Sequence, residues 1–253
     1  GMDLAATDYV IETAMDLRWL TYLVEYGNVW NVTLANDIAM PAGVEFQMIG
    51  AANNGFYGES ASNRKTFDGQ NHTISGLKFR STSSDAGMFC SLKYADIKNL
   101  TVEVDAEAAT AYIGGIVGYA VEGVTFQNIT VKGRVVVTGG SYGCAAIAAA
   151  VGKKADDVPV YFINCRNEAA VGGAYGYNIG SMFGTAGGSS DSVYVCNCSN
   201  TGAITAAGSV GYVFGYGYLS SAATLEIIGF TNSGTVNGGA GSISNAAGSG
   251  YTY

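Results

Sequence analysis

The chain has 253 residues, of which 48% are hydrophobic and 13% charged, and its formal net charge is −8. That acidic balance argues against a nucleic-acid surface, and the longest apolar run, residues 144–151, is too short to span a bilayer. We therefore expect no nucleic acid as a partner and no membrane span in this chain.

Residues 1–8 are expected to form an N-terminal arm outside the folded repeat. The opening Gly-Met is typical of a remnant left by an expression tag in front of a trimmed mature chain. This interpretation predicts an extracellular or cell-surface protein whose signal peptide has been removed.

Residues 9–28 predict an α-helix, because apolar side chains recur there at steps of three and four. These side chains are Val10, Ala14, Leu17, Leu20 and Val24. Thr13 is the expected N-cap, Asp16 occupies the position of a capping-box acid, and Gly27 is the expected stop. We expect this helix to cover the N-terminal end of the following domain, where strand edges would otherwise be exposed.

An internal repeat of roughly thirty residues follows the helix. Short β-like runs end at one column of residues, spaced 29, 36, 33 and 32 positions apart: Asn99, Asn128, Asn164, Asn197 and Gly229. The next position is apolar in every copy: Leu100, Ile129, Cys165, Cys198 and Phe230. The position two before the column is also apolar: Ile97, Phe126, Phe162, Val195 and Ile227.

The apolar pattern changes phase at the Asn column. Apolar residues lie two positions before it and one after it, whereas a continuous strand would keep an interval of two. Asn and Gly tolerate left-handed backbone geometry best, so the column predicts a corner between two strands. Stacked amides can hydrogen-bond from turn to turn, which predicts a structural ladder of Asn99, Asn128, Asn164 and Asn197.

Two further apolar columns predict two further β faces. One contains Val135, Val171, Ile204 and Val236, and the other contains Phe89, Val117, Ala148, Phe183 and Phe214. Residues 73–79 are placed one turn earlier, with Gly76 and Leu77 in register with the Asn column and its apolar neighbour.

Three short strands per repeat predict an all-β fold over residues 29–253, namely a single-stranded right-handed parallel β-helix (β-solenoid) that forms one domain with its N-terminal α-helical cap. The handedness follows the usual crossover rule. An α/β fold would need recurrent amphipathic helices, and a β-sandwich would not need columns at this period.

Five cysteines cannot all pair within the chain. Cys165 and Cys198 occupy apolar repeat positions, so we interpret them as small buried hydrophobes. A metal site at Cys196 and Cys198 is disfavoured, because His72 is the only histidine and thiolates of zinc sites lie further apart in sequence. We expect no metal and no cofactor.

Several segments together resemble the GLUG-motif β-helix proteins of bacterial surfaces, especially those of Bacteroidetes. The segments are TAMDLRWL (13–20), TLANDIAM (33–40), FDGQNHTISGL (67–77), GMFCSL (87–92) and GGIVGYA (114–120). The resemblance covers most of the chain and is looser beyond residue 137. It implies an adhesin-like secreted or surface protein, or an accessory region beside a peptidase, with no catalytic residues to carry over.

Catalytic chemistry finds little support in the sequence. A nucleophile–histidine pair would have to use His72, which we interpret as part of a turn entering a strand. Polysaccharide-cleaving β-helix enzymes need carboxylates on adjacent turns, or a carboxylate-bound cation. The expected outward columns are Asp96, Thr125, Tyr161, Tyr194 and Glu226, and then Glu103, Lys132, Glu168, Thr201 and Ser233. Neither column places two acids on neighbouring turns.

Tyrosines beside glycines are the best candidates for ligand binding, because a reachable ring with a polar tip suits sugars and protein partners. They could equally plug corners and shield strand edges. The candidates are Tyr119, Tyr175, Tyr177, Tyr212, Tyr216 and Tyr218.

The sequence thus favours a non-catalytic extracellular or cell-surface protein that binds a glycan or a host surface ligand through an exposed β-helix face. A polysaccharide-acting enzyme, either pectate-lyase-like or a glycosidase, and a structural stalk remain alternatives. Possible partners are a carbohydrate and a host surface protein.

Overall fold

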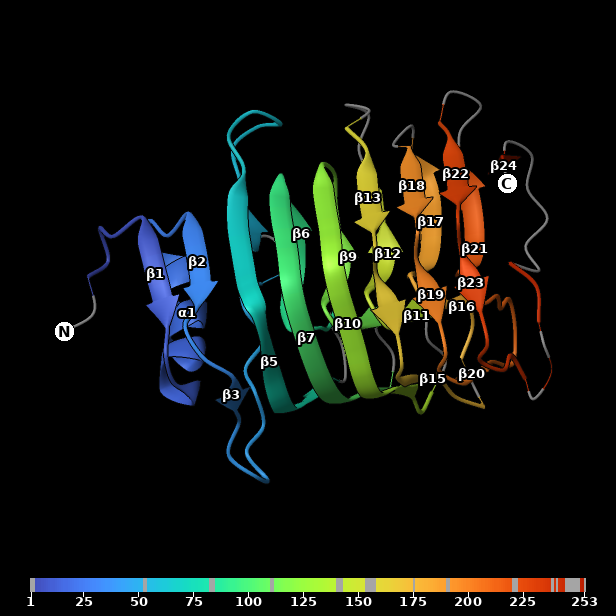
Figure 1. Ribbon diagram of the computed structural model, residues 1–253, viewed down its shortest axis with the longest axis horizontal. Coiled ribbons are helices and arrows are strands. Elements are labelled where there is room, and N and C mark those ends of the chain that lie inside the picture. Colours follow the sequence, from blue (N-terminus) through green and yellow to red (C-terminus); the bar gives the residue numbers. More distant parts are fainter. Residues whose placement is uncertain are drawn as a thin grey trace.

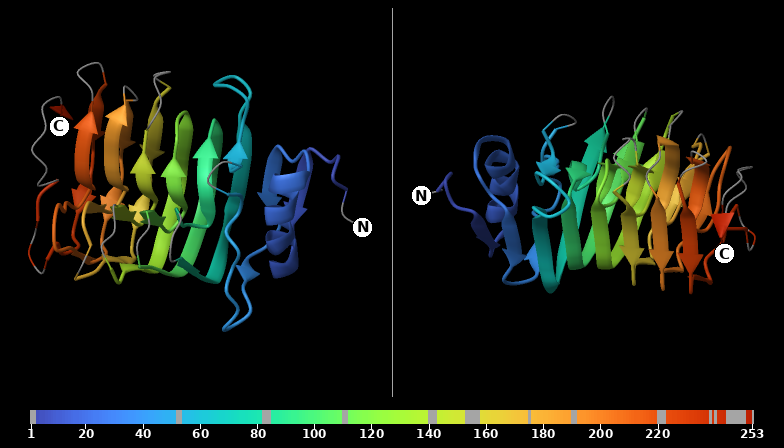
Figure 2. Two further views of the ribbon diagram at one scale, coloured as in Figure 1. Left: turned by 180° about the vertical axis from the view of Figure 1, so that it is seen from behind. Right: turned by 90° about the horizontal axis from the view of Figure 1, so that it is seen from above.

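The chain forms a parallel β-solenoid with one short helix near its N-terminus (Figure 1). This computed structural model describes residues 3–51, 54–81, 85–109, 112–139, 143–152, 158–174, 176–189, 192–219, 223–237, 239, 241–243 and 251–252. In Figure 1 the strands of the sheet in front point down, and the view from behind in Figure 2 (left) shows those of the opposite sheet pointing up. Since the chain advances from left to right in Figure 1, the coil is right-handed, as predicted.

Three parallel sheets form the walls of the solenoid. The 15-stranded sheet, here the long sheet, contains β1 (Asp8–Ile11), β2 (Asn31–Leu34), β3 (Ile38–Ala39), β5 (Lys65–Ser81), β7 (Ala95–Ala108), β10 (Val124–Val137), β13 (Val160–Ile163), β14 (Arg166–Asn167), β15 (Ala170–Gly172), β18 (Val193–Cys196), β19 (Ser199–Asn200), β20 (Ile204–Thr205), β22 (Leu225–Ile228), β23 (Thr231–Asn232) and β24 (Tyr251–Thr252). The 6-stranded sheet contains β4 (Phe56–Tyr57), β6 (Phe89–Lys93), β9 (Val117–Ala120), β12 (Ala148–Val151), β17 (Phe183–Ser189) and β21 (Phe214–Leu219). The 3-stranded sheet contains β8 (Tyr112–Gly114), β11 (Gly143–Ala145) and β16 (Ile179–Gly180).

The apolar columns of the sequence are vertical stacks of buried side chains. Ile129 pairs with Leu100, and the residues that follow Ile129, Cys165 and Cys198 pair from turn to turn. All four side chains are buried, and Cys165 N donates to Cys198 Sγ at 3.3 Å. This confirms the predicted register in the long sheet.

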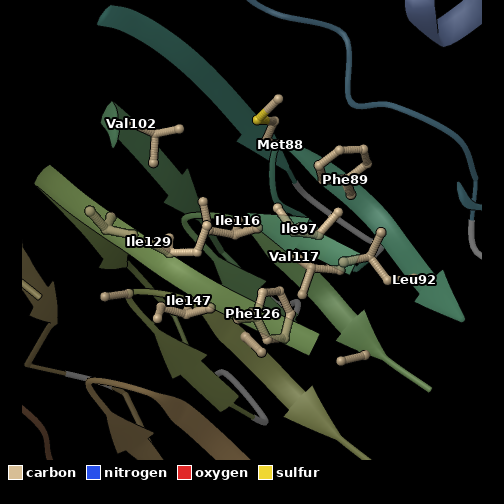
Figure 3. Packing of buried hydrophobic residues seen from close by; sticks show 14 of the residues in the cluster. Met88, Phe89, Leu92, Ile97, Val102, Ile116, Val117, Phe126, Ile129 and Ile147 are labelled. Carbon is tan, nitrogen blue, oxygen red and sulfur yellow. The ribbon is translucent and has the colours of Figure 1, made fainter. Parts of the chain in front are cut away.

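Like residues also stack across the 6-stranded sheet. Phe89 pairs with Val117, Val117 with Ala148, Ala148 with Phe183, and Phe183 with Phe214. The rings of Phe183 and Phe214 lie 5.0 Å apart and nearly parallel. Figure 3 shows buried residues of the long sheet and of the 6-stranded sheet packing in one hydrophobic core, among them Phe89, Ile97 and Phe126.

The helix α1 (Ala14–Tyr26) is shorter than predicted. Thr13 is its N-cap and forms a full capping box with Asp16, and Gly27 is its C-cap, as the sequence indicated. The prediction of helix from residue 9 is wrong, because Tyr9–Ile11 belong to β1, which pairs with β2. Val10 therefore points outward from a strand, with half of its surface exposed, instead of lying on the apolar face of the helix.

The corners of the long sheet have the predicted left-handed geometry. The φ angles of Asn99, Asn128, Asn164 and Asn197 lie between 52° and 54°, and Gly229 has a φ of 66°. Side-chain amides bridge the turns: Asn128 Nδ2 donates to Asn99 Oδ1 at 2.8 Å, and Asn164 Nδ2 donates to Asn128 Oδ1 at 3.3 Å.

The register predicted for residues 73–79 is wrong. His72 pairs with Leu100 and Leu77 with Val104, so Gly76 lies beyond the corner instead of in it. At the corner itself the left-handed residues are Gln70 and Asn71, which lie within a register shift of β5 between Asp68 and His72. Gly76, with a φ of 68°, lies within a second shift between Ile74 and Leu77.

The C-terminal end of the long sheet is partly covered by the chain itself, because β24 pairs with β22. No helix in the described part of the chain is both long and apolar enough to cross a membrane.

Candidate functional site

One outward column of the 6-stranded sheet has two small residues between two tyrosines. Tyr119 in β9 pairs with Ala150 in β12, Ala150 with Thr185 in β17, and Thr185 with Tyr216 in β21. Successive rungs are about 4.8 Å apart, so the two small residues leave a step between the two tyrosines.

A hollow of about 200 Å³ lies over this step, next to Tyr119. The rings of Tyr112 and Tyr119 form its aromatic side, with their centroids 6.5 Å apart and their planes at 14°. Its complete lining is Asp85, Tyr112, Tyr119, Ala150, Val151, Gly152 and Thr185. We call these residues the tyrosine hollow.

Two glycines shape the tyrosine hollow, because a side chain at either position would collide with residues that line it. A Cβ atom on Gly143 would lie 3.0 Å from the Tyr112 ring and 3.3 Å from Thr185 Cγ2, so it would enter the space between these side chains. A Cβ atom on Gly118 would lie 2.8 Å from Asp85 Cβ, so the segment that carries Asp85 can approach β9 only beside glycine.

Among the described residues that line the tyrosine hollow, Asp85 carries the one charge. Lys153 and Lys154 follow the lining residue Gly152 in the sequence and lie outside the described residues. A carboxylate accepts hydrogen bonds from hydroxyl or ammonium groups and repels another anion. Asp85 therefore gives the tyrosine hollow a carboxylate acceptor beside its aromatic side.

The predicted tyrosines do not form a single cluster. Tyr119 lines the tyrosine hollow, and Tyr216 lies further along the same column. Tyr212 instead stacks on Phe230 at 5.6 Å, and Tyr177 is 53% exposed and lies over Gly208. Tyr175 and the side chain of Tyr218 lie outside the described residues.

The sequence analysis missed Tyr112, which precedes the corner between β8 and β9. The signal was a spacing of seven residues between Tyr112 and Tyr119 across that corner, in the segment YIGGIVGY. Tyr161 and Tyr194, which the sequence placed on neighbouring turns of an outward column, stack with their ring centroids 5.1 Å apart on the outer face of the long sheet, although they were not among the binding candidates.

Paired carboxylates of the glycosidase kind are absent from the described pairings of the long sheet. Asp96 lies between Thr66 and Thr125, and Asp105 lies between Lys78 and Arg134. These acids bind cations instead: Arg64 contacts Asp96 at 2.6 Å, and both Arg80 and Arg134 contact Asp105. Such ladders stabilise the outer face and leave no pair free for acid–base chemistry.

His72 lies within β5, and its Nδ1 is 3.1 Å from Asp37 Oδ1. The same Asp37 oxygen accepts a hydrogen bond from Thr73 N, and this bond together with that from His72 lowers the pKa of Asp37. Among the described residues no hydroxyl or thiol bonds to the other nitrogen of His72. This arrangement holds a strand edge in place and does not activate a nucleophile.

Four of the cysteines are buried, and Cys196 is half-buried. Burial raises the pKa of the Cys144 thiol to about 12, so this side chain stays protonated. Within the described ranges no group of three or more His, Cys, Asp and Glu side chains could hold a metal ion.

No family model matches the chain, and neither does any curated protein. Among solved structures, the chain is similar to the crystal structure of a "putative immunoglobulin A1 protease" from Bacteroides ovatus. The TM-score is 0.59 and the sequence identity 19%, and the match covers 90% of this chain and 77% of that chain. At this identity the likeness shows the β-solenoid fold alone.

Proposed function

We propose that this chain is a non-catalytic extracellular or cell-surface protein of the GLUG-motif kind, and that it binds neutral carbohydrate at the tyrosine hollow. The observation that carries the proposal is the stack of Tyr112 and Tyr119 beside a step of small residues, with Asp85 at its edge. An aromatic face that borders a polar acceptor is what a sugar ring needs, because its C–H face packs on the ring while its hydroxyls donate to the carboxylate.

The size of the hollow restricts the ligand. At about 200 Å³ it is smaller than the roughly 300–1,000 Å³ of pockets for drug-sized molecules, so it suits one ring of a longer glycan. Since Asp85 repels anions, neutral hexose units are favoured over sialic or uronic acids.

The test is a glycan array, followed by calorimetric titration of the best ligand. Tyr119→Ala and Tyr112→Ala should each weaken binding about tenfold, because each removes one face of the stack. Tyr161→Ala is the matched control, since Tyr161 belongs to a tyrosine stack on the outer face of the long sheet. Equal losses in all three variants, or an array with no bound glycan, would contradict the proposal.

The name of the Bacteroides ovatus protein raises proteolysis as a second candidate function, and pectate-lyase-like or glycosidase chemistry remains a third. Neither is favoured by the contacts of His72 or by the cation-bound carboxylates described above. Cleavage of an immunoglobulin, or release of unsaturated or reducing sugar from polysaccharide, would establish either one. Silence in all of these assays would favour the structural stalk.

A further inference from the structure

The helix α1 carries apolar and aromatic side chains on both of its faces, the one that packs on the solenoid and the one that is exposed. Leu17, Leu20, Leu23 and Val24 are buried against the solenoid. On the other side Met15, Trp19, Tyr22 and Tyr26 are exposed by 57%, 44%, 42% and 59%. Steps of four, three and four place these side chains on one stripe of the helix.

The stripe borders a groove. A hollow of about 380 Å³ lies between α1 and Gln47, lined by Met15, Arg18, Trp19, Thr21, Tyr22, Glu25 and Gln47. The rings of Trp19 and Tyr22 meet edge to face at 6.3 Å, and Tyr22 lies 4.7 Å from Tyr26. The view from behind shows α1 at the N-terminal end, with no other described segment in front of it (Figure 2, left).

The stripe is symmetric along the helix. Met15 and Tyr26, and likewise Trp19 and Tyr22, lie equally far from the midpoint between Leu20 and Thr21. The exposed charges Arg18 and Glu25 are centred one residue later, which is a displacement of about 1.5 Å along the axis. Neither charge is in an ion pair within the described part of the chain.

We propose that α1 pairs antiparallel with α1 of a second copy of this chain, about a two-fold axis close to Leu20 and Thr21. A two-fold interface applies the same patch twice, so it requires a patch that complements itself when reversed. Reversal places Trp19 against Tyr22 of the other copy and Met15 against its Tyr26. It also brings Arg18 to within about 3 Å, measured along the helix axis, of the level of Glu25 of the other copy, and it does so twice. This charge complementarity favours a second copy over an unrelated apolar partner.

Sedimentation of the intact chain over a range of concentrations, with charge-reversed variants, tests this pairing. The unaltered chain should form a dimer. Arg18→Glu alone and Glu25→Arg alone should each raise the dimer dissociation constant about tenfold or more, since each variant sets two like-charge contacts across the axis. An equimolar mixture of the two single variants should dimerise again, and so should the chain that carries both substitutions.

Trp19→Glu should abolish the dimer, and Glu12→Gln, outside the stripe, should leave it unchanged. Arg18 and Glu25 are both exposed, so their charge reversal should not disturb the fold, and far-ultraviolet circular dichroism should show this. A monomer at every concentration would overturn the proposal. So would a dimer that is insensitive to Arg18→Glu and Trp19→Glu, or single variants that fail to restore association when mixed.

Discussion

At the scale of single residues, the amide ladder of the corners begins at a carboxylate. Asn99 Nδ2 donates to Asp68 Oδ1 at 3.0 Å, and the amides of Asn128 and Asn164 each donate to the amide oxygen of the preceding turn. A carboxylate accepts hydrogen bonds and cannot donate them, so Asp68 sets the direction in which the amides of Asn99, Asn128 and Asn164 point. Gln70 N also donates to this oxygen at 2.9 Å.

Asp68 should make stability depend on pH. Burial raises the pKa of Asp68, but the hydrogen bonds from Gln70 N and the Asn99 amide and the charge of Lys98 outweigh it, so the pKa lies below its ordinary value of 3.8. A carboxyl whose pKa is lower in the folded state stabilises the fold above pH 3.8, and this contribution is lost as the pH falls through the folded pKa.

Urea unfolding from pH 2 to 7 measures this effect. The stability difference between the unaltered chain and Asp68→Asn should shrink as the pH falls below about 4, because Asn does not titrate. Glu12→Gln, away from the ladder, is the control. A difference that stays constant across this range would show that Asp68 does not anchor the ladder.

The sequence predicts the corner residues of the turns from β7 onward, but it does not predict those of the corner within β5. Asn99 and Asn128 recur in one column because each corner bends at one left-handed residue. In β5 the bend uses Gln70 and Asn71 together, and no column reveals a two-residue bend. Tyr112 escaped prediction for a related reason, since it meets Tyr119 only across a corner and not along a column.

At the scale of elements, the long sheet changes character along the solenoid. The strands β5, β7 and β10 run unbroken through the corner, whereas the later turns divide into pieces such as β13, β14 and β15. The division coincides with a change of one inward column, in which Val102 and Val131 are followed by Asn167, Asn200 and Asn232.

These inner asparagines form a second amide ladder that the sequence analysis missed. Asn167 Nδ2 donates to Asn200 Oδ1 at 2.7 Å, and Asn200 Nδ2 donates to Asn232 Oδ1 at 2.8 Å. Asn167 also binds the backbone of Ala169 in both directions, which bends the chain out of a straight strand. Asn167 and Asn200 are fully buried, so water cannot reach their amides. The hydrogen bonds within the protein must therefore satisfy these polar groups.

Asn200→Val should therefore be strongly destabilising, although Val occupies the same column in earlier turns. The substitution removes the acceptor of the buried Asn167 amide and the donor to the buried Gly202 O, at about 1–3 kcal/mol for each buried group left unsatisfied. Urea unfolding measures the change. Asn197→Gly, three residues earlier on the exposed corner, is the matched control and should be nearly neutral, as Gly229 fills that column one turn later. Equal effects of the two substitutions would contradict this assignment.

The boundary of α1 illustrates how local and non-local signals compete. Val10 fits the helical spacing of Ala14 and Leu17, so the apolar pattern alone extends the helix too far. The capping box of Thr13 and Asp16 marks the true start, and pairing of β1 with β2 fixes the residues before it as strand. That pairing depends on a partner twenty-three residues away, from Asp8 to Asn31, which periodicity cannot report.

At the scale of the whole molecule, charge is concentrated in the turns of β5, β7 and β10. The ion pairs there join Arg80 and Arg134 to Asp105 across three successive strands. Two other outward columns, those of Asp96 and Lys98, carry mostly apolar and aromatic residues in the later turns. The first continues with Tyr161, Tyr194 and Glu226, and the second with Ile163, Cys196 and Ile228. The tyrosine hollow lies on the other wall, over β9, β12 and β17.

This gradient should appear in the local stability of the solenoid. A solenoid is stabilised by contacts between neighbouring turns, so the local stability of each turn depends on its own structure and on its interfaces with the two adjacent turns. Between β7 and β10 the ladder is nearly continuous and cation–carboxylate contacts reinforce it, whereas the pairing of β18 with β22 covers only Val193–Cys196. Hydrogen exchange read by mass spectrometry should find the slowest amides in β7 and β10 and faster exchange in β18 and β22. Uniform protection along the chain would mean that the turns unfold as one cooperative unit and that the unbroken strands add no local stability.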